Sequence, residues 1–268
     1  MVLLKAYWRD FVRFIPLLIE LTARDFKLKY RRSFLGIVWS MLNPLLIMIV
    51  ITSMFSILLK SPPSDMPFAV YYITGSTLFS FLSEATSSSM TSVIMNASLI
   101  KKVYIPKYIF ALEKCAFSFI NMLLSSIAML MVVGFYIIQG DICPHITMFL
   151  IFIPMFFTFV FTVGVGLILS ALTVFFRDIM HIWNVITTIW MYATPIMYPA
   201  ELLKNHGLEW VIRLNPMFYF VDDFRNLMIN GVIPDLSHFL LSFAICSFVL
   251  IFGTLLFRKV QDRFILHI

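Results

Sequence analysis

The feature that most constrains this chain is a series of apolar runs with few or no charged residues. A helix needs about 20 mostly apolar residues to cross the hydrocarbon core of a bilayer. Six runs meet this requirement, and one of them is interrupted by a single acidic residue: 36–59, 68–94, 115–138, 146–176, 179–198 and 239–257. Since an isolated helix satisfies all its backbone hydrogen bonds in lipid, the runs predict an all-α integral membrane protein with six transmembrane helices.

Composition supports lipid as the solvent. Of the 268 residues, 61% are hydrophobic and 13% are charged, whereas a soluble domain is about half apolar and about 25% charged. The net charge of +6 could suggest a nucleic-acid partner. The basic residues, however, lie at the edges of the apolar runs, which is typical of a membrane surface. We therefore expect a multi-pass membrane protein that binds no nucleic acid.

The distribution of lysine and arginine predicts the orientation. With six spans, both termini lie on one side of the membrane, and that side carries sixteen of the twenty basic residues against four on the other. Segments rich in lysine and arginine stay in the cytoplasm. Both termini are therefore predicted to be cytoplasmic.

Residues 4–18 are typical of an interfacial amphipathic helix. Apolar residues recur there at helical spacing, and basic residues lie off their stripe. Such a helix lies on the cytoplasmic face with its apolar side in membrane lipid; a mobile tail is the alternative. The stripe consists of Leu4, Trp8, Phe11, Ile15 and Leu18, with Lys5, Arg9 and Arg13 beside it.

The segment 199–235 is apolar and aromatic although it lies between two spans. The dipeptide Asn215-Pro216 breaks it in the middle. We expect two short re-entrant helices packed against the outer half of the bundle, because irregular backbone at that depth must be covered by protein. A simple external loop is the alternative.

No motif for catalysis, metal binding or nucleotide binding is present: the sequence has no GxxxxGK[ST], no GxSxG, no HExxH and no CxxC. The chain itself is predicted to hold no catalytic residue, no metal and no cofactor, so energy must come from another subunit. Glu84 is the one acidic residue deep in an apolar run. It could contact a pore or substrate, or it could bond to the neighbouring serines Ser83, Ser87, Ser88 and Ser89.

The loop 96–107 could receive a soluble partner. Asn96 or Ser98 could cap a short helix, and Pro106 would end it. Leu99, Ile100 and Val103 would form an apolar patch beside Lys101 and Lys102. A basic loop that only fixes topology is the alternative, and the loop alone does not decide between them.

The chain resembles the permease subunits of polysaccharide-type ABC exporters, which export O-antigen, capsule or teichoic-acid chains. The resemblance extends over nearly the whole chain and rests on five segments in order: residues 24–45 (RDFKLKYRRSFLGIVWSMLNPL), residues 96–107 with the motif YIPK, residues 175–179 (FFRDI), residues 194–199 (TPIMYP) and residues 215–226 (NPMFYFVDDFRN).

The resemblance implies a homodimer of permeases in the bacterial inner membrane, with two cytoplasmic subunits that bind ATP and Mg²⁺. It implies one permease domain over 1–268, with an interfacial segment 1–32, a bundle 36–257 and a cytoplasmic tail 258–268. It assigns the coupling helix to 96–103, the re-entrant helices to 199–230 and the gate helix to the N-terminal segment that contains Trp8, Phe11, Arg13 and Ile15.

The resemblance also implies a channel for a lipid-linked glycan, and sugars stack on aromatic faces. The lining candidates are Trp39, Phe79, Phe81, Glu84, Trp183, Trp190, Tyr192 and Tyr198, although aromatic residues also pack spans and anchor interfaces. Trp183 and Trp190 are seven residues apart and should share a helix face that excludes Tyr192. Alternative functions are export of a lipid, drug or other amphiphile by the same architecture, and a membrane enzyme that acts on a lipid carrier.

Overall fold

The computed structural model describes residues 2–31, 33–58 and 66–266, and the side chains of residues 12–31, 33–55 and 66–264. Helices account for nearly all of these residues, and none of them forms a strand. The elements are α1 (Val2–Tyr30), η1 (Gly36–Val38), α2 (Trp39–Leu58), α3 (Phe68–Met95), α4 (Ala97–Ile100), α5 (Tyr108–Gln139), η2 (Ile146–Ile151), α6 (Phe152–Phe175), α7 (Ile179–Ala193), α8 (Ala200–Asn205), α9 (Glu209–Leu214), α10 (Pro216–Arg225), the π-helical turn η3 (Asn226–Asn230), α11 (Leu236–Val260) and η4 (Gln261–Leu266).

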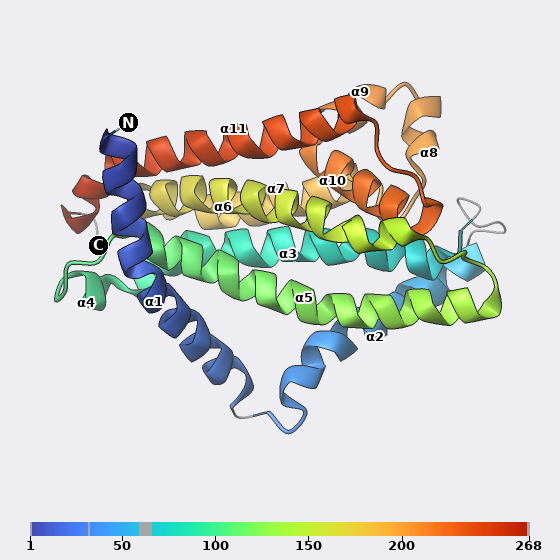
Figure 1. Cartoon of the computed structure of the whole chain (residues 1–268), viewed down its shortest axis with the longest axis horizontal. Helices are drawn as coiled ribbons and strands as arrows, with labels where there is room; N and C mark the ends of the chain where they lie inside the picture. Colours follow the sequence, from blue (N-terminus) through green and yellow to red (C-terminus); the bar gives the residue numbers. More distant parts are fainter. Residues whose placement is uncertain (1, 32, 59–65, 267–268) are drawn as a thin grey trace.

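The long helices form one elongated bundle. Helices α3, α5, α6 and α11 run side by side along its length, and α7 packs beside α3 and α6 (Figure 1). Helices α1 and α2 diverge from the bundle and form a V below α5 (Figure 1). The N-terminus, α4 and the C-terminus lie at one end of the bundle, and α8 and α9 lie at the other.

Four segments of the described chain are long and apolar enough to cross a membrane, namely Gly36–Phe55, Tyr108–Gln139, Ile146–Phe175 and Leu236–Phe264. The expectation of a multi-pass membrane protein is met, but two of the six predicted spans do not pass this test. Helix α3 is long enough but too polar. Helix α7 has only 15 residues, which is about 22 Å at 1.5 Å per residue.

The predicted end of the fifth span at residue 198 is wrong. Helix α7 ends at Ala193, and Thr194 takes an extended conformation. The cause is Pro195, since a proline disfavours the helical conformation of the residue before it. The third predicted run is wrong at its other boundary, because α5 already begins at Tyr108.

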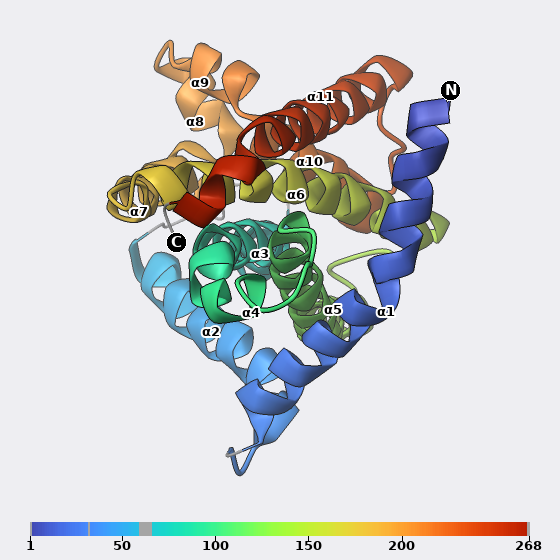
Figure 2. The same ribbon diagram turned by 90° about the vertical axis from the view of Figure 1, so that its left-hand side faces the viewer.

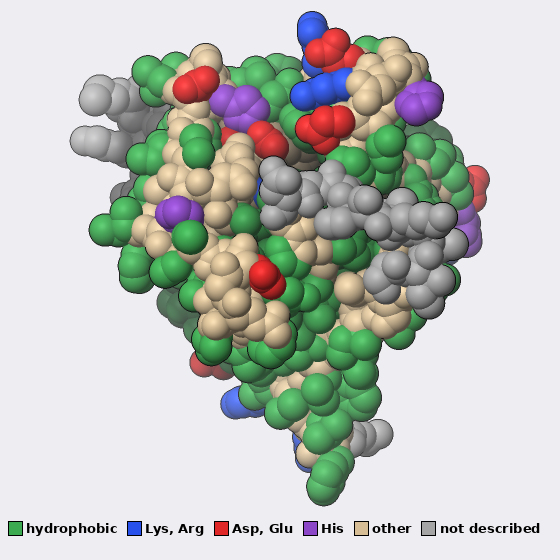
Figure 3. Space-filling view, turned by 90° about the vertical axis from the view of Figure 1, so that its right-hand side faces the viewer, with side chains coloured by type: hydrophobic (Ala, Val, Ile, Leu, Met, Phe, Trp, Pro, Cys, Tyr) green, Lys and Arg blue, Asp and Glu red, His purple; other side chains and the backbone are tan. Residues whose placement is uncertain are grey.

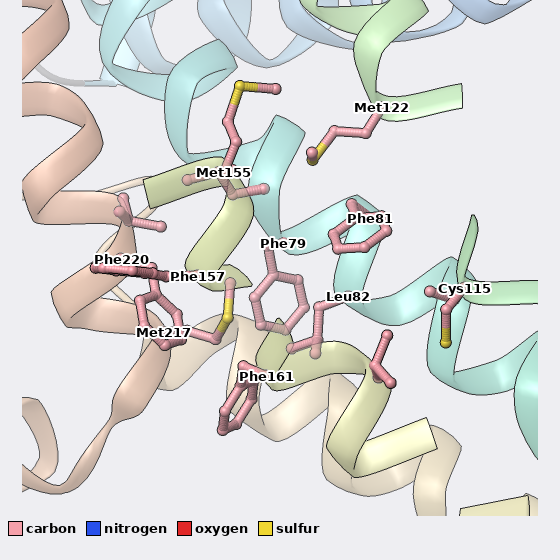
Figure 4. Packing of buried hydrophobic residues seen from close by; sticks show 14 of the residues in the cluster. Phe79, Phe81, Leu82, Cys115, Met122, Met155, Phe157, Phe161, Met217 and Phe220 are labelled. Atoms are coloured by element: carbon pink, nitrogen blue, oxygen red, sulfur yellow. The ribbon is translucent and has the colours of Figure 1, made fainter. Parts of the chain in front are cut away.

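A continuous apolar core lies among α3, α5, α6 and α10. Figure 4 shows part of it, with large side chains from all four helices turned toward one another. The labelled residues of this cluster are Phe79, Phe81, Leu82, Cys115, Met122, Met155, Phe157, Phe161, Met217 and Phe220. Helix α3 therefore has protein on most of its circumference.

The segment between α7 and α11 contains three short α-helices and a π-helical turn, so the prediction of two helices is too few. The predicted break at Asn215-Pro216 is confirmed. The Asn215 side chain accepts a hydrogen bond of 3.0 Å from the Met217 backbone nitrogen, and Pro216 occupies the first helical position. After this cap, α10 turns back into the bundle and contacts α3 and α6.

Charged and histidine side chains gather over α8 and α9, while the part formed by α2 is largely hydrophobic (Figure 3).

The predicted N-terminal helix is confirmed and is longer than expected. It continues to Tyr30 and bends along its length (Figure 2), with Pro16 inside it. The side chains of Trp8 and Phe11 lie outside the described residues, while Arg13 is exposed and Ile15 is half-buried. The second half of α1 packs on α5.

Helices α6 and α11 cross in close contact at a pair of glycines. A Cβ atom on Gly253 would lie 2.3 Å from the carbonyl oxygen of Gly164. A Cβ atom on Gly164 would lie 2.7 Å from the backbone nitrogen of Leu250. Backbone atoms cannot move aside as the end of a flexible side chain can. The crossing therefore requires both glycines, as is common where membrane helices approach closely.

We predict that Gly253→Ala destabilises the protein by about 1–3 kcal/mol or more, because the added methyl group forces the two backbones apart. Gly134→Ala on α5 is the matched control, since a Cβ atom there meets nothing within 4 Å. That variant should be neutral or slightly stabilised by the better helix propensity of alanine. Thermal unfolding of the detergent-purified variants measures both effects, and equal melting temperatures would contradict the packing argument.

Candidate functional site on the exposed face of helix α3

Helix α3 exposes one narrow face, and that face is polar. From Phe68 to Val93, every residue of α3 outside this face is buried. The accessible residues recur every three or four positions and therefore lie on one side of the helix. We call them the polar stripe: Ser76, Ser80, Ser83, Glu84, Ser87, Ser88 and Thr91.

The hydroxyls in the middle of the polar stripe are free to bond to something outside the chain. Ser80, Ser83 and Ser87 have no hydrogen-bond partner among the described residues. At the two ends, Ser76 donates to the Ile73 carbonyl (3.3 Å) and Thr91 donates to the Ser88 carbonyl (3.2 Å). Polar groups turned toward hydrocarbon would be costly. The polar stripe is therefore suited to water or a polar ligand, and it explains why α3 is too polar for a lipid-facing span.

Helix α3 lies between α7 and α2 (Figure 2). On one side, the Trp183 indole nitrogen donates a 3.0 Å hydrogen bond to the Thr86 hydroxyl of α3. The Trp190 ring meets the Phe79 ring of α3 edge to face at 6.4 Å. On the other side, the second half of α2 contacts α3, where the Phe55 and Phe68 rings stack at 5.0 Å. The first half of α2 instead borders a cavity.

This cavity, the α2–α3 pocket, has a volume of about 340 Å³ and is open to the outside. It combines aromatic, amide, hydroxyl and charged side chains from α1, α2, α3 and α5. Its lining is Lys29, Tyr30, Trp39, Ser40, Asn43, Pro44, Ile47, Tyr72, Ser76, Thr77, Ser80, Phe81, Glu84, Asn121, Met122 and Ser125. Ser76, Ser80 and Glu84 belong to both the pocket and the polar stripe, so the two are continuous.

Glu84 is held in the pocket by an ion pair. Its Oε1 atom lies 3.1 Å from Lys29 Nζ and accepts a 3.3 Å hydrogen bond from Asn121 Nδ2. Asn121 in turn accepts a hydrogen bond of 3.1 Å from the Tyr30 hydroxyl. The expected alternative, a carboxylate bonded to nearby serines, is not what the structure shows: the Glu84 backbone carbonyl, rather than its carboxylate, accepts from Ser88.

A second ion pair fixes α1 against α5. Asp25 pairs with Lys114 of α5 and with Arg24 of α1. Burial alone would raise the pKa of Asp25, but the hydrogen bonds and charges of Lys114 and Arg24 outweigh it and hold the pKa below its ordinary value. Asp25 therefore stays ionised at neutral pH, and Lys29, one turn further along α1, is placed beside Glu84.

The structure divides the eight lining candidates into three groups. Trp39, Phe81 and Glu84 line the α2–α3 pocket. Phe79, Trp183 and Trp190 pack together inside the chain. Tyr192 is 60% exposed, and its backbone carbonyl accepts a hydrogen bond from the half-buried Tyr198.

The predicted difference between the tryptophans and Tyr192 is confirmed. The rings of Trp183 and Trp190 meet edge to face at 6.2 Å, and the Trp190 nitrogen donates a 2.7 Å hydrogen bond to Asn215 Oδ1. Both rings point into the protein, whereas Tyr192 points outward. Asn215 thus joins α7 to the start of α10 as well as capping it.

The loop 96–107 differs from its predicted form. Helix α4 has a single turn that ends at Ile100, well before Pro106, and the Asn96 side chain donates to Ser92 (2.8 Å) instead of capping it. The predicted apolar patch is divided, because Ile100 is buried and Leu99 packs on the core while Val103 is exposed. The other exposed residues of this loop are Ser98, Lys101, Lys102 and Tyr104, of which Tyr104 is 90% exposed.

The amino-acid sequence alone did not indicate the role of two sets of residues. Lys29, Asn43 and Asn121 line the pocket, and only their polarity within or beside apolar runs could have indicated them. Arg225 is one of the four basic residues predicted to lie on the external side, and it is buried. It donates 2.9 Å hydrogen bonds to the carbonyls of Pro195 and Tyr71 and lies 3.6 Å from the centre of the Tyr71 ring. Arg225 therefore joins α10 to α3.

We predict that Trp190→Ala destabilises the protein by about 3–5 kcal/mol, since it leaves a cavity and removes the bond to Asn215. Tyr192→Ala, two residues away and exposed, should change stability by no more than about 0.5 kcal/mol. Trp190→Phe should fall between them, because it keeps a ring and loses only the hydrogen bond. Folded yield and melting temperature in detergent report the order, and equal values for Trp190→Ala and Tyr192→Ala would refute it.

The sequence matches the profile of the ABC-2 type transporter family over residues 16–229. The chain is 27% identical to the O-antigen export system permease protein RfbA of Myxococcus xanthus over 258 residues, or 96% of each chain. It is 27% identical to the protein of that name from Klebsiella pneumoniae, over 92% of this chain and 93% of that one. Identity to the capsule polysaccharide export inner-membrane protein CtrC of Neisseria meningitidis serogroup A is 22%, over 76% of each chain. Since the family profile covers most of the sequence, the chain belongs to the ABC-2 type transporter family.

Proposed function

We propose that this chain is the permease subunit of an ATP-driven exporter that moves a lipid-linked polysaccharide, such as O-antigen, capsule or teichoic acid, from the cytoplasm across the bacterial inner membrane. The names of its relatives support a polysaccharide as cargo. The observation that carries the proposal is the polar stripe, a hydrophilic path on the central helix of a membrane bundle.

The chemistry of the polar stripe suits a glycan better than an amphiphile. Its hydroxyls can exchange hydrogen bonds with water and with sugar hydroxyls at similar energy, so a long hydrophilic chain can slide without being trapped. Its one charge, Glu84, is balanced by Lys29. A carrier of lipids or drugs would require a broad apolar cavity, and a membrane enzyme would require groups that transfer protons at neutral pH, which serine hydroxyls do not.

The polar stripe also supports the count of six spans. It extends over about 22 Å at 1.5 Å per residue, which is most of the hydrocarbon thickness of about 30 Å. Helix α3 can cross the membrane if this face borders water instead of lipid. Helix α7 is too short to cross alone, and α10, folded back beside α3 and α6, completes the outer part as a re-entrant helix.

A second copy of the chain would close the path. Only 6% of the residues in the most apolar part of the first span are buried within this chain, compared with 50% in Ile146–Phe175. Large apolar residues such as Ile47, Val50 and Met54 are exposed on α2. In a homodimer, α2 would find protein contacts and the polar stripe would be enclosed between the two copies.

Energy would come from two ATP-binding subunits at the end of the bundle that carries α4 and both termini, which would be the cytoplasmic end. Tyr104, with Val103 and the lysines Lys101 and Lys102, forms the exposed surface there. Aromatic side chains surrounded by polar groups are frequent hot spots of protein interfaces. This chain has no phosphate-binding loop, so ATP and Mg²⁺ would bind the partner.

The export path is tested by changing hydroxyls of the polar stripe. Ser83→Leu combined with Ser87→Leu should strongly reduce surface polysaccharide per amount of folded protein, because the path becomes apolar while the core is untouched. The conservative pair Ser83→Thr and Ser87→Thr keeps both hydroxyls and should export normally. Normal export by the leucine variant would show that the polar stripe is not the path.

The docking surface is tested by Tyr104→Ala. We expect the affinity-tagged chain to retain the ATP-binding subunit about thirtyfold more weakly, the effect of losing a hot spot worth about 2 kcal/mol. The matched control is Phe149→Ala, which removes an 80% exposed ring of η2, the short helix between α5 and α6. ATP hydrolysis by the captured complex is the readout, and the chain purified alone should show none. If Tyr104→Ala captures the ATP-binding subunit as well as the unchanged chain does, the proposed docking surface is wrong. The assignment of this end of the bundle as cytoplasmic then loses its support from docking.

A further inference from the structure

We infer that the α2–α3 pocket is a binding site for one uncharged sugar unit of the polysaccharide in transit. The inference rests on the proposed function and adds a defined site, and a preference for a class of sugar, to the hydrophilic path. It depends on the size of the pocket, on the chemistry of its walls and on its charge.

The size of the pocket fits a short piece of glycan. Its volume of about 340 Å³ lies at the lower end of the range of about 300–1,000 Å³ for small-molecule sites. One wall is α2, where Trp39 and Asn43 are one turn apart and both are exposed. The facing wall is α3, where Ser80 and Glu84 have the same spacing. A ring between these walls meets an aromatic face on one side and polar groups on the other.

The walls present the groups that sugar recognition requires. The Trp39 side chain is 47% exposed and can stack on the C–H face of a sugar ring. The amide of Asn43 can both donate to and accept from hydroxyls. Glu84 bonds to Lys29 and Asn121 through Oε1 alone, and its Oε2 atom has no partner among the described residues. This carboxylate oxygen is a strong acceptor for a sugar hydroxyl.

Charge favours an uncharged unit. Lys29 and Glu84 are the charged residues of the lining, and they are paired with each other, so the pocket has no net charge. A sugar with a carboxylate or phosphate that binds Lys29 would place its negative charge beside the Glu84 carboxylate, which repels it. A neutral sugar can donate a hydroxyl to Glu84 Oε2 and leave the ion pair intact.

The position of the pocket connects it to the path. Ser80 and Glu84 are shared with the polar stripe, so a unit bound beside Trp39 has the rest of its chain along α3. The pocket would hold the glycan one unit at a time as it passes. The Asp25–Lys114 pair positions Lys29 beside the pocket through α1.

Photo-crosslinking in exporting cells tests the site. A benzophenone amino acid replaces Ile47, an apolar lining residue of the pocket one turn after Asn43, Thr91 at the end of the polar stripe, whose hydroxyl already donates to the Ser88 carbonyl, or Phe248, which is 69% exposed on α11. After irradiation, the chain is purified and examined for a glycan ladder by carbohydrate staining. We expect ladders from Ile47 and Thr91 and none from Phe248. A ladder from Thr91 alone would overturn the pocket and leave the path standing, whereas ladders from neither would overturn both.

The role of Glu84 and the class of sugar are read from the same adducts. Glu84→Ala should lower the Ile47 adduct by about tenfold, the effect of one charge-assisted hydrogen bond, while the Thr91 adduct persists. Mass spectrometry of the crosslinked peptide after acid trimming of the glycan identifies the attached unit. A unit that carries a carboxylate or phosphate, or an Ile47 adduct indifferent to Glu84→Ala, would refute the inference.

Discussion

The burial of α3 on every side but one is the constraint on which the rest of the structure depends. Helices α5 and α6 run along it, α10 turns back to cover it, and α7 and α2 border the face that remains. A helix so covered needs close neighbours, and the Gly164–Gly253 contact that seats α11 on α6 supports that packing from outside. The one uncovered face is the polar stripe. The packing of the other helices around α3 therefore both stabilises the bundle and leaves the polar stripe exposed.

The hydroxyl groups of this bundle have two different roles, and their hydrogen bonds distinguish them. Buried threonines donate to the carbonyl one turn earlier in their own helix, which satisfies a hydroxyl in apolar surroundings at little cost. Thr74, Thr77, Thr86, Thr158 and Thr173 all do so. Ser80, Ser83 and Ser87 have no such bond and point outward. The buried threonines therefore stabilise the packed helices, whereas the outward-facing serines are available to bind a ligand.

Charged side chains connect segments that apolar packing alone would leave loosely related. Arg225 ties α10 to the carbonyls of Pro195 and Tyr71. Lys29 ties the end of α1 to Glu84 of α3, and Asp25 ties α1 to Lys114 of α5. Removing one partner of the largely buried Asp25–Lys114 pair leaves an uncompensated charge, which is far more costly than the pair itself is stabilising. The Lys29–Glu84 and Asp25–Lys114 pairs hold the second half of α1 beside the pocket.

The amino-acid sequence by itself determined the class of fold, because apolar runs of membrane-spanning length allow few alternatives to helices. It also determined the break at Asn215-Pro216, which is a local matter of a side-chain cap and a ring without an N–H group, and the shared face of Trp183 and Trp190, which follows from helical periodicity. The ABC-2 type family was likewise visible in the motifs.

Only the tertiary structure decided which polar residues are available. The serines of α3 and the threonines beside them look alike in the sequence, and their difference depends on which neighbours cover each face. The partner of Glu84 lies 55 residues earlier in the chain, on α1, and Arg225 is buried by segments from three parts of the chain. Local spacing cannot predict such contacts, because they are set by how helices pack at long range. The pocket between Trp39 and Glu84 exists because the first half of α2 leaves a cavity against α3.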